Sequence, residues 1–391
     1  MEECVFLEEK IWSYKDDDVK SFIAELIDFR KNENPFYVVD LSSIITQYKK
    51  WLSLLPNITP FYAVKCNPDE NLLKLLDKLG CNFDCASKNE IGKVLALSSS
   101  KNPEKIIYAN PCKSKEHLLY AKDNGVKKLT FDCVEELHKI KEVYPEAELI
   151  LRIQVDDSKS LCKFNTKFGC AISDAEHVLY TSSLLKLNVI GVSFHVGSGC
   201  KDCSVYKTAL NFCKVIFDIG TALNFNMKIL DIGGGFPGSK NKVSFEDVAQ
   251  VLKENLDFPD YVQVISEPGR FIAEQSHTLV LNVTGKKENV NELGEKIFMY
   301  YLNDGIYGSF NCIIFDYAKP EIKTFKIGEL YKSIVFGPTC DSLDRIGEFL
   351  LPELDVSDWC YVENFGAYTS SAASTFNGFS KPELVYAIKV T

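Results

Sequence analysis

The chain contains no run of about 18 consecutive apolar residues, so the sequence predicts no membrane-spanning helix. Its first residues, MEECVFLEEK, are acidic and lack the apolar core of a secretory signal peptide. Positive charge is comparatively scarce, since 44 Lys and Arg residues stand against 54 Asp and Glu residues, which gives a net charge of −10. This balance argues against nucleic acid or an anionic membrane surface as the main partner.

Motifs for metal sites and serine hydrolases are also missing. The sequence has only 5 histidines and neither an HExxH nor a GxSxG motif, so we predict no metal site. The 14 cysteines are scattered without a regular framework, and without a secretory signal they indicate free thiols in a reducing cytosol. We therefore expect a cytoplasmic protein in which most cysteines act as small buried apolar residues.

The chain's length and patterning favour two domains of different class. Its 391 residues exceed what a single ordinary core accommodates. A strand-then-helix alternation repeats eight times, which is typical of a (β/α)8 barrel, with a doubly wound open sheet as the alternative fold. The predicted strands cover residues 61–65, 82–86, 105–110, 128–132, 148–155, 189–196, 228–233 and 262–267.

After about residue 275 the pattern changes to short β-rich segments separated by Gly, Pro and Asn turns. These segments predict a second, mostly β domain, a sandwich or a small barrel. The N-terminal leader carries one predicted helix, residues 17–29, and we expect it to join this domain. The predicted division is a barrel at 38–275 and a β-domain made of 1–37 and 276–391.

Lys65 lies at the end of the first predicted barrel strand, in the segment PFYAVKCNP. An ammonium group buried without a partner is costly, so a lysine in this place either extends to solvent or has a lowered pKa. A lowered pKa suits an amine that forms an imine. This segment alone leaves both interpretations open.

The other strand ends add further polar residues. Active sites of (β/α)8 barrels lie at the carboxyl ends of their strands, so residues at these ends are expected to converge on one rim. The residues at these ends are Lys65, Asp84, Asp132, Arg152, His195, Gly233, Gly234, Gly235 and Glu267.

Two motifs on this rim suggest a phosphorylated cofactor. DIGGGFPG, residues 231–238, matches GxGxxG, but a proline and a polar stretch separate it from the next helix, unlike a dinucleotide fingerprint. Its glycines form a tight turn or, as we favour, a cradle for phosphate. EPGRF, residues 267–271, adds Arg270 as a phosphate clamp and Glu267 as a partner for a pyridinium nitrogen. With Lys65, these features predict pyridoxal 5'-phosphate.

Several residues have a plain structural interpretation beside the functional one. His195 is either a satisfied core histidine or a flat surface against a cofactor ring. In the β-domain, FGPTCDSLDRI places Cys340 beside Asp341. Considered alone, Cys340 is more readily interpreted as a small buried residue than as a functional one. The segments FDYA and GAYT add an acid, Asp316, and a phenol, Tyr368.

Taken together, these motifs resemble the ornithine decarboxylases, a group of barrel-fold pyridoxal-phosphate decarboxylases with the alanine racemase-like type III fold. The resemblance covers nearly the whole chain. It rests on FYAVKCN, FDCAS, FHVGSG, DIGGGFPG, EPGRF, YYLNDGIYGSFN, GPTCD and ENFGAYT.

The resemblance implies a reaction and a set of residues. The reaction is decarboxylation of L-ornithine to putrescine and CO2, the first step of polyamine synthesis. Lys65 matches the Schiff-base lysine, His195 the residue stacked on the ring, and Cys340 the residue that returns a proton to the substrate carbon. Glu267 matches the partner of the ring nitrogen. The implied cofactor-binding residues are Lys65, Asp84, Arg152, His195, Ser198, Gly233, Gly234, Gly235, Glu267, Pro268, Gly269, Arg270 and Tyr368. The implied substrate-binding residues are Tyr307, Phe315, Asp316, Asp341 and Phe376.

Partners also follow from the resemblance. In the family, Cys340 and Asp341 match residues that come from the other subunit, which implies a homodimer with shared active sites. An antizyme-like regulatory protein near residues 113–136 is left open. The labile C-terminal extension of the animal proteins is not expected here.

Three departures from the family pattern put the substrate's length in doubt. Phe315 replaces the usual tyrosine, Ser342 replaces a glycine, and residues 316–340 form a shorter segment than in animal members. Lysine or arginine could therefore be the substrate, whereas the acids Asp316 and Asp341 should repel diaminopimelate. A non-catalytic, regulator-binding homologue and a racemase are alternatives of other classes, although Lys65 and Cys340 argue against a non-catalytic protein.

Overall fold

A computed structural model describes residues 10–15, 19–156, 158, 160–162, 165–200, 202–239, 243–290 and 292–390 of the chain. These residues divide into two compact units. One unit is Gln47–Ile272, and the other comprises the residues up to Thr46 and from Ala273 onward. The N-terminal stretch in which we predict no secretory signal, residues 1–9, lies outside the described residues.

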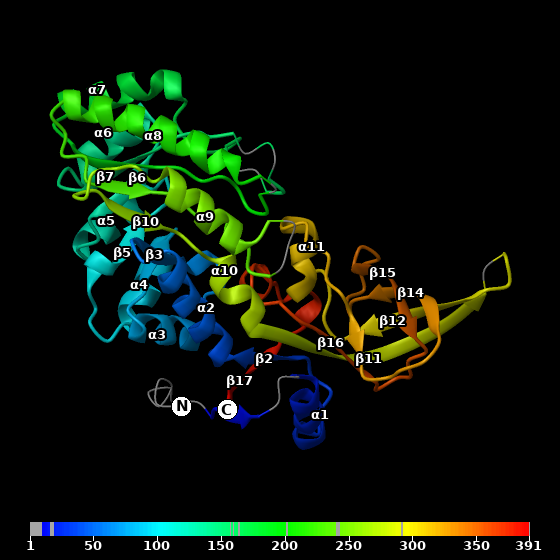
Figure 1. Cartoon of the computed structure of the whole chain (residues 1–391). Helices are drawn as coiled ribbons and strands as arrows, with labels where there is room; N and C mark the ends of the chain where they lie inside the picture. Colours follow the sequence, from blue (N-terminus) through cyan, green and yellow to red (C-terminus); the bar gives the residue numbers. More distant parts are fainter. Residues whose placement is uncertain are drawn as a thin grey trace. The chain divides into compact units, whose positions relative to one another are not determined.

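The unit Gln47–Ile272 contains a closed barrel of parallel strands (Figure 1). Each strand pairs with its neighbour in sequence, and the last strand pairs with the first. The predicted (β/α)8 barrel is therefore confirmed. Its strands are β3 (Ile58–Ala63), β4 (Asn82–Cys85), β5 (Ile106–Tyr108), β6 (Lys128–Phe131), β7 (Glu148–Arg152), β8 (Asn188–Ser193), β9 (Ile229–Asp231) and β10 (Gln263–Ser266).

Apolar side chains from strands all round the barrel form one buried cluster, which is possible only in the barrel interior. Its members are Phe61, Ile107, Ile150, Ile190, Ile229 and Ile265. Each such side chain stabilises the fold by about 1.5–3 kcal/mol relative to an exposed one. Because this layer fills the middle of the barrel, the polar residues are confined to the strand ends.

Amphipathic helices alternate with the barrel strands, beginning with one before the first strand, and surround them (Figure 1). Their starts are set by side-chain caps, as for Asp69, which accepts from the N–H of Leu72, and for Ser244, which forms a capping box with Asp247. The helices are α2 (Leu41–Leu54), α3 (Glu70–Lys78), α4 (Lys88–Leu97), α5 (Lys115–Asp123), α6 (Val134–Val143), α7 (Ala175–Leu184), α8 (Ser204–Ala222), α9 (Phe245–Asn255) and α10 (Arg270–Ala273).

The other unit is built on a mostly antiparallel sheet in the order β1-β17-β2-β11-β12-β14-β15, with β16 paired to β11 and β13. This confirms the predicted mostly β domain. Its helices are α1 (Val19–Arg30) and α11 (Cys312–Phe315). Its strands are β1 (Trp12–Tyr14), β2 (Phe36–Asp40), β11 (His277–Val290), β12 (Lys296–Leu302), β13 (Lys323–Thr324), β14 (Leu330–Phe336), β15 (Arg345–Pro352), β16 (Trp359–Val362) and β17 (Glu383–Lys389).

Short 3-10 helices complete the chain, and one of them changes a prediction. Lys65 does not end a strand, because β3 stops at Ala63 and Lys65 lies in η2 (Val64–Cys66). The N–H of Ala63 donates to Pro268 O, beyond the end of β10, and the chain then turns. The others are η3 (Pro103–Lys105), η4 (Ile172–Asp174), η5 (Glu274–Ser276), η6 (Ser309–Asn311), η7 (Ser370–Ala372) and η8 (Phe376–Gly378).

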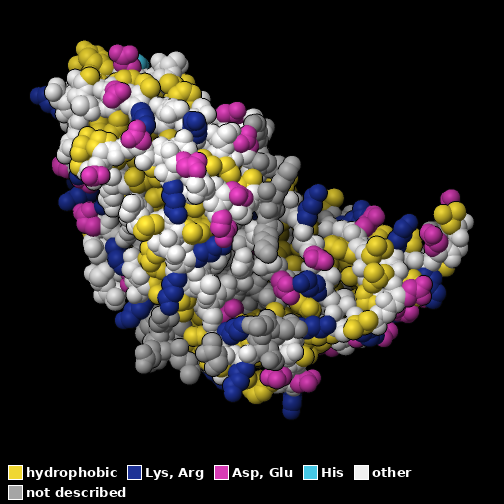
Figure 2. Space-filling model, viewed as in Figure 1, with side chains coloured by type: hydrophobic (Ala, Val, Ile, Leu, Met, Phe, Trp, Pro, Cys, Tyr) yellow, Lys and Arg dark blue, Asp and Glu magenta, His cyan; other side chains and the backbone are white. Residues whose placement is uncertain are grey.

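On the face shown in Figure 2, Lys and Arg side chains are interspersed with Asp and Glu side chains. Many form exposed ion pairs, such as Lys115 with Glu142 at 2.5 Å, which contribute little to stability. Among the described residues, no helix combines the length and the apolar character needed to cross a bilayer.

Candidate active site

Lys65 pairs with Asp84 at the carboxyl end of the barrel. The Lys65 Nζ lies 2.6 Å from Asp84 Oδ2, and the lysine side chain is 40% exposed while the aspartate side chain is fully buried. A buried carboxylate needs such a partner because its desolvation is costly. The second oxygen, Asp84 Oδ1, is buried and has no hydrogen-bond partner among the residues that the structure describes. The pair therefore fixes one side of the amine and leaves a polar atom for a further group.

Glu90 supports the strand end that carries Asp84. Its Oε2 accepts a 2.6 Å hydrogen bond from the N–H of Ala86, two residues beyond Asp84. Burial raises the pKa of Glu90, and the charge of Asp84 raises it further. The residues of β4 and the start of α4 thus hold two acids near one amine.

The glycine run after β9 brings three backbone segments together. Gly233 and Gly235 have positive φ values of 64° and 97°. A Cβ at Gly235 would lie 2.2 Å from Gly197 O, and one at Gly234 would lie 2.6 Å from Glu267 O. Only glycine allows this approach, and a glycine-rich backbone of this kind can present its N–H groups to an anion.

Arg270 contributes a cation to the same part of the barrel. Its Nε and Nη2 each lie 3.4 Å from Ser198 Oγ. The loop of Ser198 is held by two backbone hydrogen bonds with Cys162, of 3.1 and 3.2 Å. A guanidinium and a hydroxyl in contact form a donor group suited to phosphate oxygens.

Glu267 and Asp231 form a buried pair of acids. Burial raises the pKa of Glu267 well above its ordinary value, and the charges of Asp231 and Asp84 raise it further. Burial also raises the pKa of Asp231, to about 7. Asp231 Oδ1 accepts from the N–H of Gly233 at 2.9 Å, and Oδ2 is buried with no hydrogen-bond partner among the described residues. The negative charges of the two acids oppose each other, which favours a proton held by Glu267.

His195 is a half-buried, neutral imidazole. Burial lowers its pKa well below the ordinary value, and the charges of Arg152 and Lys65 lower it further. His195 Nδ1 accepts a 2.9 Å hydrogen bond from the N–H of Gly197, which assigns the ring proton to Nε2. The Nε of Arg152 is buried, and no described residue forms a hydrogen bond with it. The electrostatic effects show that the predicted residues of the barrel rim lie within reach of one another.

Asp132, which the strand-end pattern also marks, has a structural role. Its Oδ2 accepts a 2.8 Å hydrogen bond from the N–H of Gly169 and so fixes the segment after β7. Sequence reasoning assigned no role to Asp231. The available signal was an acid directly before the glycines, at the end of a buried strand.

The predicted substrate residues lie in the β-rich unit. The Tyr307 hydroxyl donates to Asp341 Oδ2, and this bond together with the N–H of Leu343 lowers the pKa of Asp341. The rings of Tyr307 and Phe376 stack with centroids 4.4 Å apart. Cys340 is exposed, and its N–H donates to Asn377 Oδ1 at 3.0 Å. The interpretation of Cys340 as a small buried residue is therefore wrong.

The remaining predicted residues of this unit show two different environments. Phe315 ends α11 and is 71% exposed, and Asp316 follows it with its N–H bonded to Cys312 O at 3.0 Å. Tyr368 has a positive φ of 56°, next to the buried Thr369. A non-glycine residue in this conformation is uncommon and often marks a functional position.

Comparison with known proteins identifies the family. The family described as pyridoxal-dependent decarboxylase, pyridoxal binding domain, matches residues 41–274. The ornithine decarboxylase of Caenorhabditis elegans is 46% identical over 380 residues, which cover 93% of this chain and 90% of that protein. The chain belongs to the ornithine decarboxylase family. Its resemblance to that family is thereby confirmed.

Other members of this decarboxylase family and its relatives show how far the similarity extends. Antizyme inhibitor 2 of Xenopus laevis is 42% identical, with coverage of 95% of this chain and 85% of that protein. The crystal structure of the Paramecium bursaria Chlorella virus arginine decarboxylase superposes with a TM-score of 0.87 at 34% identity, covering 94% of this chain and 99% of that one. The fold is thus shared by proteins whose names differ in substrate and in function.

Pyridoxal phosphate, the cofactor of this decarboxylase family, fits the residues of the barrel rim. The glycine run at Gly235 and the Arg270–Ser198 contact suit its phosphate. The acids Glu267 and Asp231 suit its ring nitrogen, and the amine of Lys65 suits its aldehyde.

Proposed function

We propose that this chain decarboxylates L-ornithine to putrescine and CO2 with pyridoxal phosphate as cofactor. The observation that carries the proposal is the Lys65–Asp84 ion pair at the mouth of a barrel whose rim also holds a glycine run and a buried glutamate. Similarity to ornithine decarboxylases over more than nine tenths of the chain supports it.

The barrel residues would bind and orient the cofactor. When bound, pyridoxal phosphate supplies an aldehyde for the amine and a ring that takes up the electrons left by the departing carboxylate. Lys65 Nζ would bond to that aldehyde, and Glu267 would keep the ring nitrogen protonated. The neutral His195 would cover one face of the ring without placing a second positive charge beside the protonated ring nitrogen. The phosphate would lie against Gly235 and Arg270.

The other predicted cofactor residues would complete this binding site. Asp84 and Arg152 would fix polar groups near Lys65. Ser198 and Tyr368 would donate hydrogen bonds from their hydroxyl groups to the phosphate. The remaining contacts would come from the backbone of Gly233, Gly234, Pro268 and Gly269.

Substrate selection would depend on the β-rich unit. Asp341 keeps its charge because its pKa is lowered, so with Asp316 it would attract an ammonium at the far end of the substrate. Tyr307, Phe376 and Phe315 would line the methylene chain. Lysine is longer by one methylene, which is worth only about 1–3 kcal/mol of discrimination, so side activity on lysine is expected.

We also propose that the protein acts as a homodimer in which Cys340 and Asp341 serve the site of the partner. Cys340 would deliver the proton to the substrate carbon. An exposed apolar side chain near these residues in sequence supports a covered surface, since Leu343 is 75% exposed. Mixing inactive Lys65→Ala and Cys340→Ala proteins should restore part of the activity, whereas monomeric sedimentation would contradict the dimer.

Product analysis tests the function directly. Protein loaded with pyridoxal phosphate is incubated with ornithine, lysine and arginine in parallel, and diamines and CO2 are measured. Putrescine should exceed the other products, and Lys65→Ala is the control for background. If cadaverine or agmatine is the main product, the preferred substrate is lysine or arginine, respectively, and not ornithine.

The similarity to an antizyme inhibitor favours one alternative, a non-catalytic protein that binds a regulator. The presence of Lys65, Glu267, Arg270 and Cys340 argues for catalysis. Absence of CO2 from all three amino acids would favour the alternative, and an antizyme-like protein would then be the partner to test. We also propose a cytoplasmic location, because the cysteines of the sequence follow no regular disulfide framework.

A further inference from the structure

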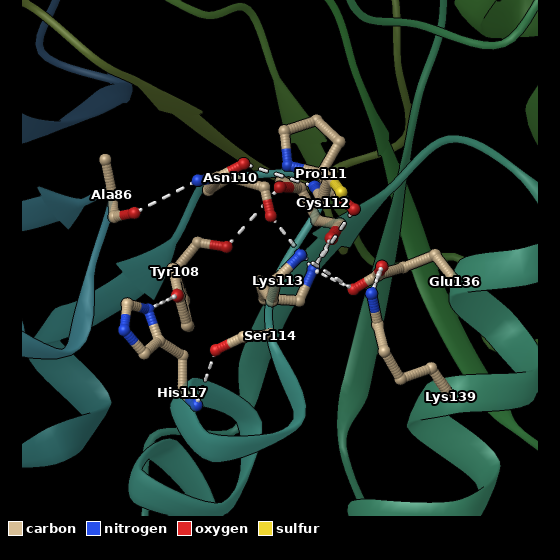
Figure 3. Close-up of polar contacts among 11 residues, drawn as sticks. Ala86, Tyr108, Asn110, Pro111, Cys112, Lys113, Ser114, His117, Glu136 and Lys139 are labelled. Atoms are coloured by element: carbon tan, nitrogen blue, oxygen red, sulfur yellow. Dashed lines mark hydrogen bonds and ion pairs between the residues drawn. The ribbon is translucent and has the colours of Figure 1, made fainter.

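Lys113 is a buried cation that the proposed chemistry does not use. It lies in the loop between β5 and α5, and its side chain is fully buried. Figure 3 shows it directed between its own loop and Glu136 of α6. Burial lowers the pKa of Lys113, and the carboxylate of Glu136 opposes this shift.

All three donors of the Lys113 ammonium have close acceptors. Nζ lies 2.6 Å from Thr130 O on β6, 2.9 Å from Asn110 O in its own loop and 2.9 Å from Glu136 Oε1. Glu136 is 2% exposed and also pairs with Lys139 at 2.5 Å. The cation therefore ties one loop to the next strand and to the next helix.

A buried ion pair is weak evidence for a stabilising role, because apolar residues of similar volume often stabilise a fold as well or better. The geometry that this pair fixes is therefore more informative than its energy. The contacts of Lys113 connect it, through Asn110 and Ala86, to the chain segment that follows Asp84, the partner of Lys65.

Asn110 transmits the position of the loop to β4. Its backbone O accepts from Lys113, its Oδ1 accepts from the N–H of Cys112 at 3.1 Å, and its Nδ2 donates to Ala86 O at 3.2 Å. Ala86 is the residue whose N–H donates to Glu90, two positions after Asp84. A backbone bond of 3.1 Å from the N–H of Ala109 to Cys85 O reinforces the same link.

We propose that Lys113 is a positioning residue for the Lys65–Asp84 pair. Its cation fixes the β5–α5 loop, the loop's Asn110 holds the segment after β4, and Asp84 is thereby kept at 2.6 Å from Lys65 Nζ. The significance of this for catalysis depends on the proposed function, but the structural link does not.

The test compares Lys113→Met with Lys105→Met. Methionine fills the same volume without donors, and Glu136 keeps Lys139 as a partner, so no unpaired carboxylate is created. Lys105 precedes the same strand at its opposite end and binds Asp77 Oδ1 at 2.7 Å, so it controls for the loss of an ion pair.

Hydrogen exchange of the apoprotein is the first readout. In Lys113→Met, the amides of Ala86, Ala109 and Cys112 should exchange about tenfold faster, because their acceptors lose a fixed position. Lys105→Met should leave these amides unchanged even if both variants lose thermal stability. Unchanged exchange at Ala86 in Lys113→Met would overturn the inference.

The visible absorbance of cofactor bound to Lys65 is the second readout. The carboxylate of Asp84 favours the positive form at Lys65, so a displaced Asp84 should lower the pH midpoint of the band by about 0.5 unit in Lys113→Met. A wild-type midpoint would contradict the proposal. Asn110→Ala keeps the ion pair but removes the link to Ala86, and it should reproduce both effects if Lys113→Met does not fold. If no protein forms the band, the proposed function fails, while hydrogen exchange still decides the positioning role.

Discussion

Replacing Gly235 by alanine tests whether the glycine run holds the phosphate. The residue has a φ of 97°, in the region that side-chain-bearing residues rarely adopt. The added Cβ would lie 2.2 Å from Gly197 O, whereas ordinary contact begins at 3.4 Å. Both atoms belong to backbone segments of the barrel rim, so no flexible side chain can relieve the contact.

The size of the effect follows from these distances. The left-handed conformation costs an alanine about 1–2 kcal/mol. The contact in addition forces the two segments apart by about 1 Å. A misplacement of about 1 Å can lower an enzyme's rate about a hundredfold, and we expect a loss of the same order in cofactor affinity. We therefore expect the Kd for pyridoxal phosphate to rise about a hundredfold in Gly235→Ala, which is about 2.8 kcal/mol.

Titration of the apoprotein with pyridoxal phosphate, followed by absorbance, measures this Kd. Gly294→Ala is the matched control, because Gly294 has a φ of 78° but no atom within 4 Å of the added Cβ. It should lose stability from backbone strain and keep its cofactor affinity. If Gly235→Ala binds the cofactor as tightly as Gly294→Ala, the glycine run does not hold the phosphate.

Three further outcomes are expected. Lys65→Ala should abolish the visible absorbance of the bound cofactor, and a spectrum like that of the wild type would contradict the assignment. Cys340→Ala should retain the cofactor but lower putrescine production about a hundredfold or more, as for loss of a proton donor, which product analysis measures. Burial raises the folded-state pKa of Asp231 to about 7, above the ordinary value of about 3.9, so its stabilisation is full at acid pH and is lost as the pH rises through about 7. In Asp231→Asn, the thermal stability of the apoprotein should fall less than in the wild type between about pH 5 and pH 8. If the stability of the variant falls with pH as much as that of the wild type, the raised pKa of Asp231 is not the cause.

The sequence by itself determined the barrel and the set of residues on its rim. Alternating apolar strands and amphipathic helices are local patterns, and parallel strands all present their carboxyl ends at one edge. Residues such as Lys65, Asp84 and Arg270 could therefore be assigned to that edge before any contact was known.

Only the tertiary structure decided which of these residues act on one another. The ion pair of Lys65 with Asp84, the contact of Asp231 with Glu267, and the burial of Lys113 join residues from different strands and loops. Such contacts depend on strand register and on closure of the barrel, which no local pattern encodes. The pKa shifts of these groups arise from burial and from neighbouring charges, so they too exist only in the folded chain.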